Sequence, residues 1–280
     1  MPTFDRAECE ERFSEHAAIN IPRIGAVKVA ITRLLRSIDY IGHSHNEDSG
    51  RFDRRAIVKF VAGSANVFSR REFKEADTAA VEVMIDVSGS MGYDGGRKIC
   101  IASVVANQLS AIFEKTGTPY AIIGFDGRSV AEQFIAGGAS ASDIAGGSWS
   151  KHSYAEQVNL YRFKDWHETR RTAALKLGAI SGTPNGGTPD FGGVYLAIDE
   201  LSKRTERRRI LFLLTDAEGY NMTNMQHLQT VADKLKITIV AIGIGTNDAK
   251  RAFTNAAAVQ NVDDLGSVAF TKLLAGIKEC

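Results

Sequence analysis

The sequence predicts an α/β fold in which helices cover both faces of a doubly wound, mostly parallel sheet. From residue 79 onward, short apolar runs of strand length alternate with longer segments whose apolar residues recur at three- and four-residue spacing. The apolar runs are nearly continuous, as expected of parallel strands that are covered on both faces. This alternation is typical of open sheets built from strand–helix units.

The expected elements of this main region follow in a regular order. Strands are expected at 79–86, 119–127, 129–135, 208–216 and 237–245. Helices are expected at 98–116 (with Gly117 as the stop), at about 168–180, after Thr188, at 222–236 and at 263–279. Residues 136–167, which are rich in Gly and Ser and then in aromatic residues, are expected to be irregular.

Residues 1–78 are expected to form an N-terminal helical extension that packs on a main domain at 79–280. Helical structure is predicted over roughly residues 1–50, because apolar residues follow Pro22 at helical spacing. The polar stretch 42–50 holds two histidines and two acids, which we interpret as a solvated turn rather than a metal site. Residues 51–78 are rich in arginine and mix a short helical pattern with a short extended one.

Composition narrows the classes of function. The chain has 280 residues and a net charge of +1, so no global field draws it toward nucleic acid or a membrane. No apolar stretch reaches the length of a membrane span, and the first residues do not resemble a signal peptide. The three cysteines are an odd number and form no CxxC pair, which fits a reducing compartment. We therefore expect a cytoplasmic protein.

Oxygen-bearing side chains follow the first predicted strand. Asp86, Ser88 and Ser90 alternate with Val87 and Gly89 after an apolar run. A turn leaving a strand end can aim alternate side chains at one point, and ligands of doubly wound sheets bind beyond these ends. One carboxylate and two hydroxyls suit Mg²⁺ or Mn²⁺.

Other loops offer further oxygens for such an ion. Thr188 lies in a glycine-rich turn before a predicted helix, and Asp216 closes a later strand. Asp126 and Glu218 are weaker candidates to lie near the ion or to contact a partner, since ordinary turn and loop roles explain them about as well. The serines alone are also compatible with capping the helix that follows, although capping does not explain the acids.

The pattern Asp86-x-Ser88-x-Ser90, with Thr188 and Asp216, resembles the metal-ion-dependent adhesion site (MIDAS) of von Willebrand factor A (VWA) domains. This resemblance implies a VWA fold and implies that these five residues hold a divalent ion directly or through water. Thr183 also precedes a proline, but no helix follows it at once, so Thr188 is the better match.

Among VWA domains, the sequence resembles in particular that of the CobT subunit of aerobic cobaltochelatase. The matching segments cover most of residues 50–280 and include the runs at 50–73, 88–127, 160–168, 204–219 and 237–245. The resemblance implies an AAA+ ATPase partner (CobS-like), a large chelatase subunit, and a role in cobalt insertion into a corrin, in cobalamin biosynthesis. In that family the acid after the fourth strand is usually followed by glycine, whereas this chain has Asp216-Ala217.

The sequence does not favour catalysis by this chain alone. It contains no P-loop, no nucleophile elbow and no nucleophile–base pair beside the metal motif. We expect a Mg²⁺-dependent protein-interaction module, or a non-catalytic chelatase subunit, whose metal site is completed by an acidic side chain of a partner. The alternative is an intracellular VWA scaffold, or adhesion-type module, that binds an acidic protein ligand without an ATPase.

Overall fold

The computed structural model describes residues 5–35, 37–76, 79–129, 156–183, 186–218, 220–267 and Leu274. The chain divides into two compact units, Arg36–Thr78 and the remainder, Met1–Leu35 with Ala79–Cys280. These bounds differ from the expected domains, because the first 35 residues group with the main unit. Each unit is described by itself below.

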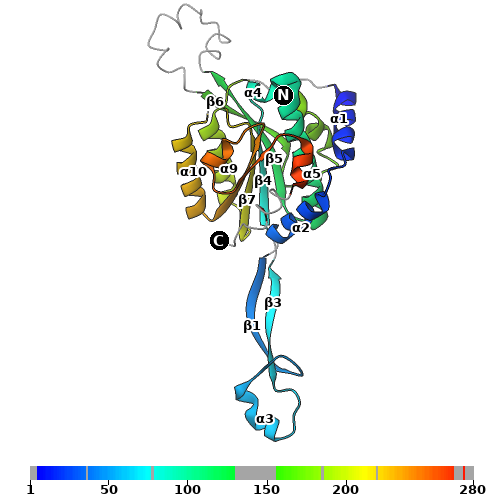
Figure 1. Ribbon diagram of the computed structural model, residues 1–280, viewed down its shortest axis with the longest axis vertical. Coiled ribbons are helices and arrows are strands. Elements are labelled where there is room, and N and C mark those ends of the chain that lie inside the picture. Colours follow the sequence, from blue (N-terminus) through cyan, green and yellow to red (C-terminus); the bar gives the residue numbers. More distant parts are fainter. Residues whose placement is uncertain are drawn as a thin grey trace, which may run out of the picture. The chain divides into compact units, whose positions relative to one another are not determined.

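A six-stranded sheet forms the centre of the main unit in the described residues (Figure 1). Its spatial order is β6-β5-β4-β7-β8-β9, and all neighbouring strands are parallel except the antiparallel pair β5 and β6. Their bounds are β4 (Ala79–Asp86), β5 (Tyr120–Ser129), β6 (Glu156–Lys164), β7 (Arg208–Thr215), β8 (Ile237–Ile244) and β9 (Ala256–Val259). The doubly wound, mostly parallel sheet is therefore confirmed.

Helices cover both faces of this sheet. One face packs against α5 (Arg97–Thr116) and α2 (Ile24–Leu35), and the same side carries α1 (Arg6–Ala18) and α8 (Ala174–Gly178). The other face packs against α9 (Asp190–Ser202), α10 (Met222–Lys234) and α11 (Ala249–Ala252). Side chains alternate between the two cores along β4, as its strand geometry requires.

Short helical turns complete the main unit. They are α4 (Gly89–Gly92), η2 (Asp94–Gly96), η4 (Ile180–Gly182) and η5 (Val262–Gly266). The helix α5 ends as expected at Gly117, which adopts a left-handed conformation with φ of 68°. None of the helices in the described part of the chain combines the length and apolar character needed to span a bilayer.

Several expected elements differ from the structure. Strand β6 lies within the segment 136–167, which was expected to be irregular. Because β6 is at the edge of the sheet, its polar and apolar residues alternate and do not form a continuous apolar run. The short strand β9 was not expected. The helix expected near 168–180 is limited to α8 and the turn η4. Most of the expected strand 129–135 and most of the closing helix 263–279 lie outside the described residues.

The second unit is mostly β structure, so the expected helix over residues 1–50 is wrong beyond Leu35. Strand β1 (Ser37–Glu47) pairs antiparallel with β3 (Phe68–Ala76), and β2 (Arg51–Phe52) pairs with the other edge of β3. Most of the polar stretch 42–50, expected from the sequence to be a solvated turn, is therefore part of strand β1. It forms a strand because a distant partner, β3, supplies its hydrogen bonds. Between β2 and β3 lie η1 (Arg54–Ala56) and α3 (Ile57–Val61).

Candidate metal centre

The sheet places two acid-tipped strands beside each other. β4 and β7 are neighbours with Ile85 opposite Leu214, although β5 and β6 lie between them in sequence. The chain builds outward from β4 on one side and later returns to its other side, so this junction is the topological switch point. Ligands of such sheets bind beyond the carboxyl ends of the strands at this point. Asp86 and Asp216 stand at these two ends.

Asp86 is fully buried, with 0% of its surface exposed. Its Oδ1 accepts a hydrogen bond from the Ser88 amide at 3.0 Å, and its Oδ2 accepts one from the Thr215 hydroxyl at 2.9 Å. Burial raises the pKa of Asp86 to about 6, and the charge of Asp216 adds to this, while hydrogen bonds from Ser88 and Thr215 oppose it. No cationic side chain in the described residues forms an ion pair with Asp86.

The two serines of the motif lie together. The Ser88 Oγ and Ser90 Oγ atoms are 3.1 Å apart. Ser88 precedes α4 at its N-cap position, but its side chain makes no capping hydrogen bond. Capping of α4 therefore does not explain Ser88, and both hydroxyl groups remain beside the buried carboxylate of Asp86.

Asp216 is also buried but has a cationic neighbour. Lys98 Nζ, from the first turn of α5, lies 2.8 Å from Asp216 Oδ2 and 3.5 Å from Glu218 Oε2. The Glu218 amide donates to Asp216 Oδ1 at 3.1 Å. Burial lowers the pKa of Lys98, but its hydrogen bond with Asp216 and the charges of Asp216 and Glu218 outweigh this, so the pKa is raised overall.

Backbone contacts bring the Thr188 loop to the same place. The Gly89 amide donates to the Gly186 carbonyl at 3.0 Å, and Gly127 and Gly187 exchange two backbone hydrogen bonds. The helix α9 begins two residues after Thr188, as expected. Thr188 is half-buried in this loop.

The rejected candidate Thr183 has a structural role. Its hydroxyl donates to the carbonyl of Ala179 at 2.7 Å, and its side chain is buried in the last turn before the loop. The structure therefore gives Thr183 a local partner. Thr188 remains the threonine that the loop contacts bring toward the motif.

The two weaker candidates differ in their surroundings. Asp126 is buried, and its two carboxylate oxygens accept hydrogen bonds from Asn159 and Tyr161, each at 2.8 Å. Glu218 is exposed at 60% of its side chain and contacts Lys98. Asp126 thus has a structural task in joining β5 to β6. A role for either residue near an ion or a partner stays a prediction.

The donor set fits a hard divalent ion. In the described residues no group of three His, Cys, Asp or Glu side chains could hold a metal. The strand ends instead offer two carboxylates and neighbouring hydroxyls, the oxygen chemistry that Mg²⁺ and Mn²⁺ accept together with water. A fully buried carboxylate with no described cationic partner suits a bound cation.

Two residues of this site were missed by sequence reasoning. The Thr215 hydroxyl donates a hydrogen bond to Asp86. The only indication of this role in the sequence is that Thr215 comes directly before Asp216, the acid that ends an apolar strand. Lys98 reaches the site from α5, eight residues after the last serine of the motif. A lysine in a first helical turn is usually solvated, so its spacing alone carried no signal.

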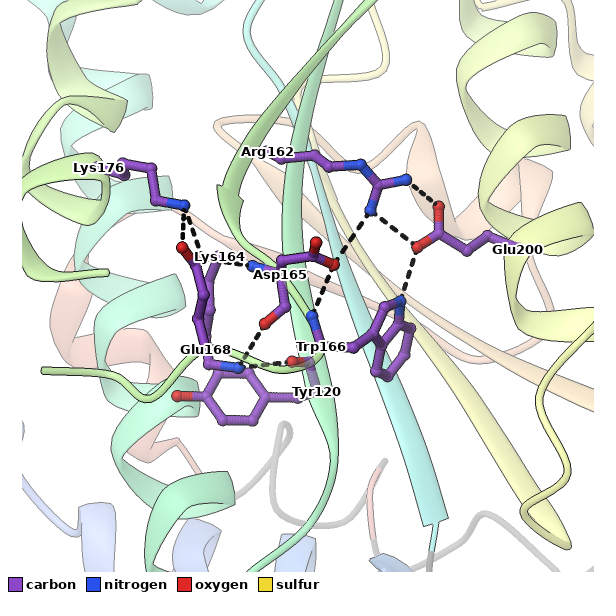
Figure 2. Close-up of polar contacts among 8 residues, drawn as sticks. All are labelled: Tyr120, Arg162, Lys164, Asp165, Trp166, Glu168, Lys176 and Glu200. Atoms are coloured by element: carbon purple, nitrogen blue, oxygen red, sulfur yellow. Dashed lines mark hydrogen bonds and ion pairs between the residues drawn. The ribbon is translucent and has the colours of Figure 1, made fainter. Parts of the chain in front are cut away.

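A second polar cluster lies near the amino ends of the parallel strands, away from the motif (Figure 2). Arg162 makes two hydrogen bonds to the carboxylate of Glu200, and the Trp166 indole donates to the same group at 2.7 Å. Buried Lys164 donates to the Tyr120 carbonyl at 2.7 Å, and Lys176 pairs with Glu168. These charged groups have partners, so the cluster joins β6 to its neighbours rather than forming an open site.

Comparison with known families gives a match over most of the chain. The family model described as the cobalamin biosynthesis protein CobT VWA domain matches residues 67–279. The match therefore contains the strands of the central sheet and the residues Asp86, Ser88, Ser90, Thr188 and Asp216. A search of curated proteins finds no match.

Several solved structures also match the chain, at low sequence identity and with TM-scores below 0.5. Proximal thread matrix protein 1 from the mussel byssus matches with a TM-score of 0.48 and 16% identity, over 71% of this chain and 47% of that one. BatB from Bacteroides thetaiotaomicron matches with a TM-score of 0.46 and 14% identity, over 71% of this chain and 98% of that one. The SpRpn10 VWA domain matches with a TM-score of 0.44 and 14% identity, over 72% of this chain and 100% of that one. The match thus spans about half the length of the mussel protein.

Proposed function

The chain belongs to the CobT family of VWA domains, and from this premise we propose that it is a Mg²⁺-dependent protein-interaction module. It works with an AAA+ ATPase, and with a large chelatase subunit, in cobalt insertion into a corrin or in related complex remodelling. The observation that carries this proposal is the fully buried Asp86 at the switch point, beside two hydroxyls and without a described cationic partner.

In this proposal each residue of the site has a separate role in binding the ion. Asp86 supplies the buried charge, and Thr215 and the Ser88 amide fix the direction of its carboxylate. Ser88 and Ser90 supply neutral oxygens, with Thr188 and Asp216 completing the set. Few protein charges face the ion, so when bound it supplies an electrophilic position that an acidic side chain of a partner can fill.

The absence of a nucleophile–base pair in the sequence favours binding over catalysis by this chain. The polar atoms of Asp86 and Thr215 bind each other, and no histidine accompanies the metal motif. The family relationship supports a role as a subunit of a larger assembly, in which chemistry and ATP hydrolysis belong to other chains.

The test is a pull-down of partners from native cell lysate with Mg²⁺ or with EDTA. The bait is the whole chain as wild type, as Asp86→Ala, and as the matched control Asp199→Ala. Asp199 is a suitable control because it is a half-exposed acid on α9 that pairs with Lys203. Circular dichroism checks that all three chains are folded.

We expect an AAA+ ATPase to be recovered with Mg²⁺ by wild type and by Asp199→Ala, and not with EDTA or by Asp86→Ala. Recovery of a different protein, again only with Mg²⁺ and only when Asp86 is intact, identifies a metal-dependent scaffold that works without the ATPase. Recovery that is independent of both Mg²⁺ and Asp86 contradicts the proposal.

A further inference from the structure

The second unit exposes apolar side chains that its own fold does not bury. In α3, Val58 is 78% exposed, Phe60 60% and Val61 82%, and Ile57 and Phe52 are about half exposed. No residue of α3 is buried. Helices of this length do not persist in water by themselves, and they normally bury an apolar face. We call these five residues the apolar patch: Phe52, Ile57, Val58, Phe60 and Val61.

A cationic hollow adjoins the apolar patch within the same unit. It has a volume of about 490 Å³, and its lining includes Arg51, Arg54, Arg55, His43 and His45. We call it the arginine pocket. Phe52 belongs to both surfaces, because it lines the pocket and packs edge-on against Phe60 at 5.9 Å. The apolar patch and the arginine pocket are therefore continuous.

The charges of the arginine pocket are unbalanced. Its carboxylate, Asp53, is engaged by His45 Nδ1 at 2.6 Å and by the Arg55 amide at 2.9 Å. These two hydrogen bonds lower the pKa of Asp53, that from the Arg55 amide most. None of the guanidinium groups of Arg51, Arg54 and Arg55 forms an ion pair with a carboxylate in the described part of the chain. The three guanidinium groups therefore outnumber the one carboxylate of the pocket, Asp53, whose charge also attracts Arg55.

We propose that the apolar patch and the arginine pocket together dock a segment of a partner protein that carries apolar side chains next to a carboxylate. Guanidinium groups bind carboxylates through paired hydrogen bonds, and arginine and aromatic residues are enriched at binding hot spots. The apolar side chains of the segment cover α3, and its carboxylate enters the pocket.

The placement of the charges favours a protein segment over a lipid surface. The arginines line a hollow next to the apolar patch, which suits one inserted side chain, whereas a bilayer presents a broad layer of headgroups. This docking surface uses none of the residues of the candidate metal centre. Its binding is therefore independent of Mg²⁺, and the two proposals succeed or fail separately.

The experiment selects ligands from a random displayed-peptide library on the immobilised whole chain, with EDTA present throughout. Affinities of the selected peptides are then measured for two double variants, Arg54→Glu with Arg55→Glu and Val58→Ser with Val61→Ser. Lys115→Glu and Val29→Ser are matched controls, because both residues are exposed on helices of the other unit. All changed side chains are exposed, so the variants should fold, which circular dichroism checks.

We expect the selected peptides to combine Asp or Glu with neighbouring apolar residues. Their affinity should fall about tenfold or more in each double variant and stay unchanged in both controls. Selection of no peptide, of peptides without acids, or of peptides that bind the double variants as well as wild type overturns the proposal.

Two further measurements distinguish other occupants of the same surface. Co-sedimentation with vesicles of phosphatidylcholine and phosphatidylserine tests a membrane, and sedimentation velocity of the whole chain tests a second copy. The proposal predicts neither vesicle binding nor self-association that depends on Val58 and Val61. Vesicle binding lost in the double variants, or a dimer dissolved by Val58→Ser with Val61→Ser, overturns it.

Discussion

The ammonium group of Lys98 lies 2.8 Å from Asp216 Oδ2 and so joins the first turn of α5 to the end of β7. Asp86, the other acid at this junction, has no such cationic neighbour in the described residues. The two carboxylates of the candidate metal centre are therefore unequal, since a fixed cation already neutralises one of them. This asymmetry has a measurable consequence for metal affinity.

Replacing Lys98 should strengthen Mg²⁺ binding. Lys98→Met removes a positive charge that opposes the incoming ion, and we expect affinity to rise about tenfold, the scale of one charge interaction near a protein surface. Isothermal titration calorimetry of the whole chain measures the change. Lys115→Met, on the exposed far end of α5, is the control and should leave affinity unchanged. Equal or weaker binding by Lys98→Met would show that the lysine does not oppose the ion.

Gly186→Ala should damage the junction between the Thr188 loop and β5. Gly186 has φ of 67°, and a Cβ there would lie 2.2 Å from the Gly127 carbonyl oxygen. Gly117→Ala is a matched control, because φ is 68° but nothing lies within 4 Å of the added atom. We expect a loss of unfolding free energy of about 1 kcal/mol for the control and of about 2 to 4 kcal/mol for Gly186→Ala.

Chemical denaturation gives both unfolding free energies, and calorimetry gives the effect on Mg²⁺. Gly186→Ala should also weaken Mg²⁺ binding, because it shifts the loop that carries Thr188. Equal destabilisation by the two substitutions would mean that the loop moves aside without cost. Unchanged Mg²⁺ affinity would argue against Thr188 as a ligand.

Glu82 should make the protein less stable as pH rises. It is fully buried on β4, and neither carboxylate oxygen has a hydrogen-bond partner. Burial raises its pKa well above the ordinary 4.5, and the charge of Glu200 adds to this, while Arg162 on β6 opposes it. Above pH 4.5 the folded protein keeps a proton that the unfolded chain releases, so the free energy of unfolding falls as pH rises until the folded-state pKa is reached.

Glu82→Gln removes this titration. The difference in unfolding free energy between the variant and wild type should therefore grow with pH above 4.5, by at most about 1.4 kcal/mol per pH unit. Urea denaturation across a pH series measures it. Glu10→Gln, at an exposed pair with Arg6, is the control and should show a nearly constant difference. A constant difference for Glu82→Gln would contradict a buried, protonated side chain.

The sequence predicted the parts of this fold that repeat a simple pattern. The strand that ends in Asp86, the helix that stops at Gly117 and the helix after Thr188 were all found from apolar spacing and stop signals. Strand β6 was missed because its hydrogen bonds come from β5 at the edge of the sheet, and its residues alternate in polarity instead of forming an apolar run. Strand β1 was missed for a similar reason, since its partner β3 lies more than twenty residues away.

The candidate site was predictable where its residues follow a motif or stand at the end of a predicted element, as Thr188 and Asp216 do. Asp86, Ser88 and Ser90 stand in one short motif, whereas Lys98 and Thr215 reach the site through packing of α5 and β7 that spacing does not encode. Ala217 stands where the resemblance to the CobT subunit implies a glycine. It adopts φ of 54°, a left-handed conformation that glycine usually supplies, and the sequence alone did not show that the backbone keeps this geometry.

The central claim is that the carboxylate of Asp86 makes the strand ends a Mg²⁺ site. Isothermal titration calorimetry of Mg²⁺ into the whole chain tests it most directly, with Asp86→Ala and Ser90→Ala as variants and Asp199→Ala as the matched control. The account predicts one saturable Mg²⁺ site in wild type and in the control, weakened in Ser90→Ala and lost in Asp86→Ala. Absence of Mg²⁺ binding by the folded wild type, or equal binding by Asp86→Ala, would contradict it.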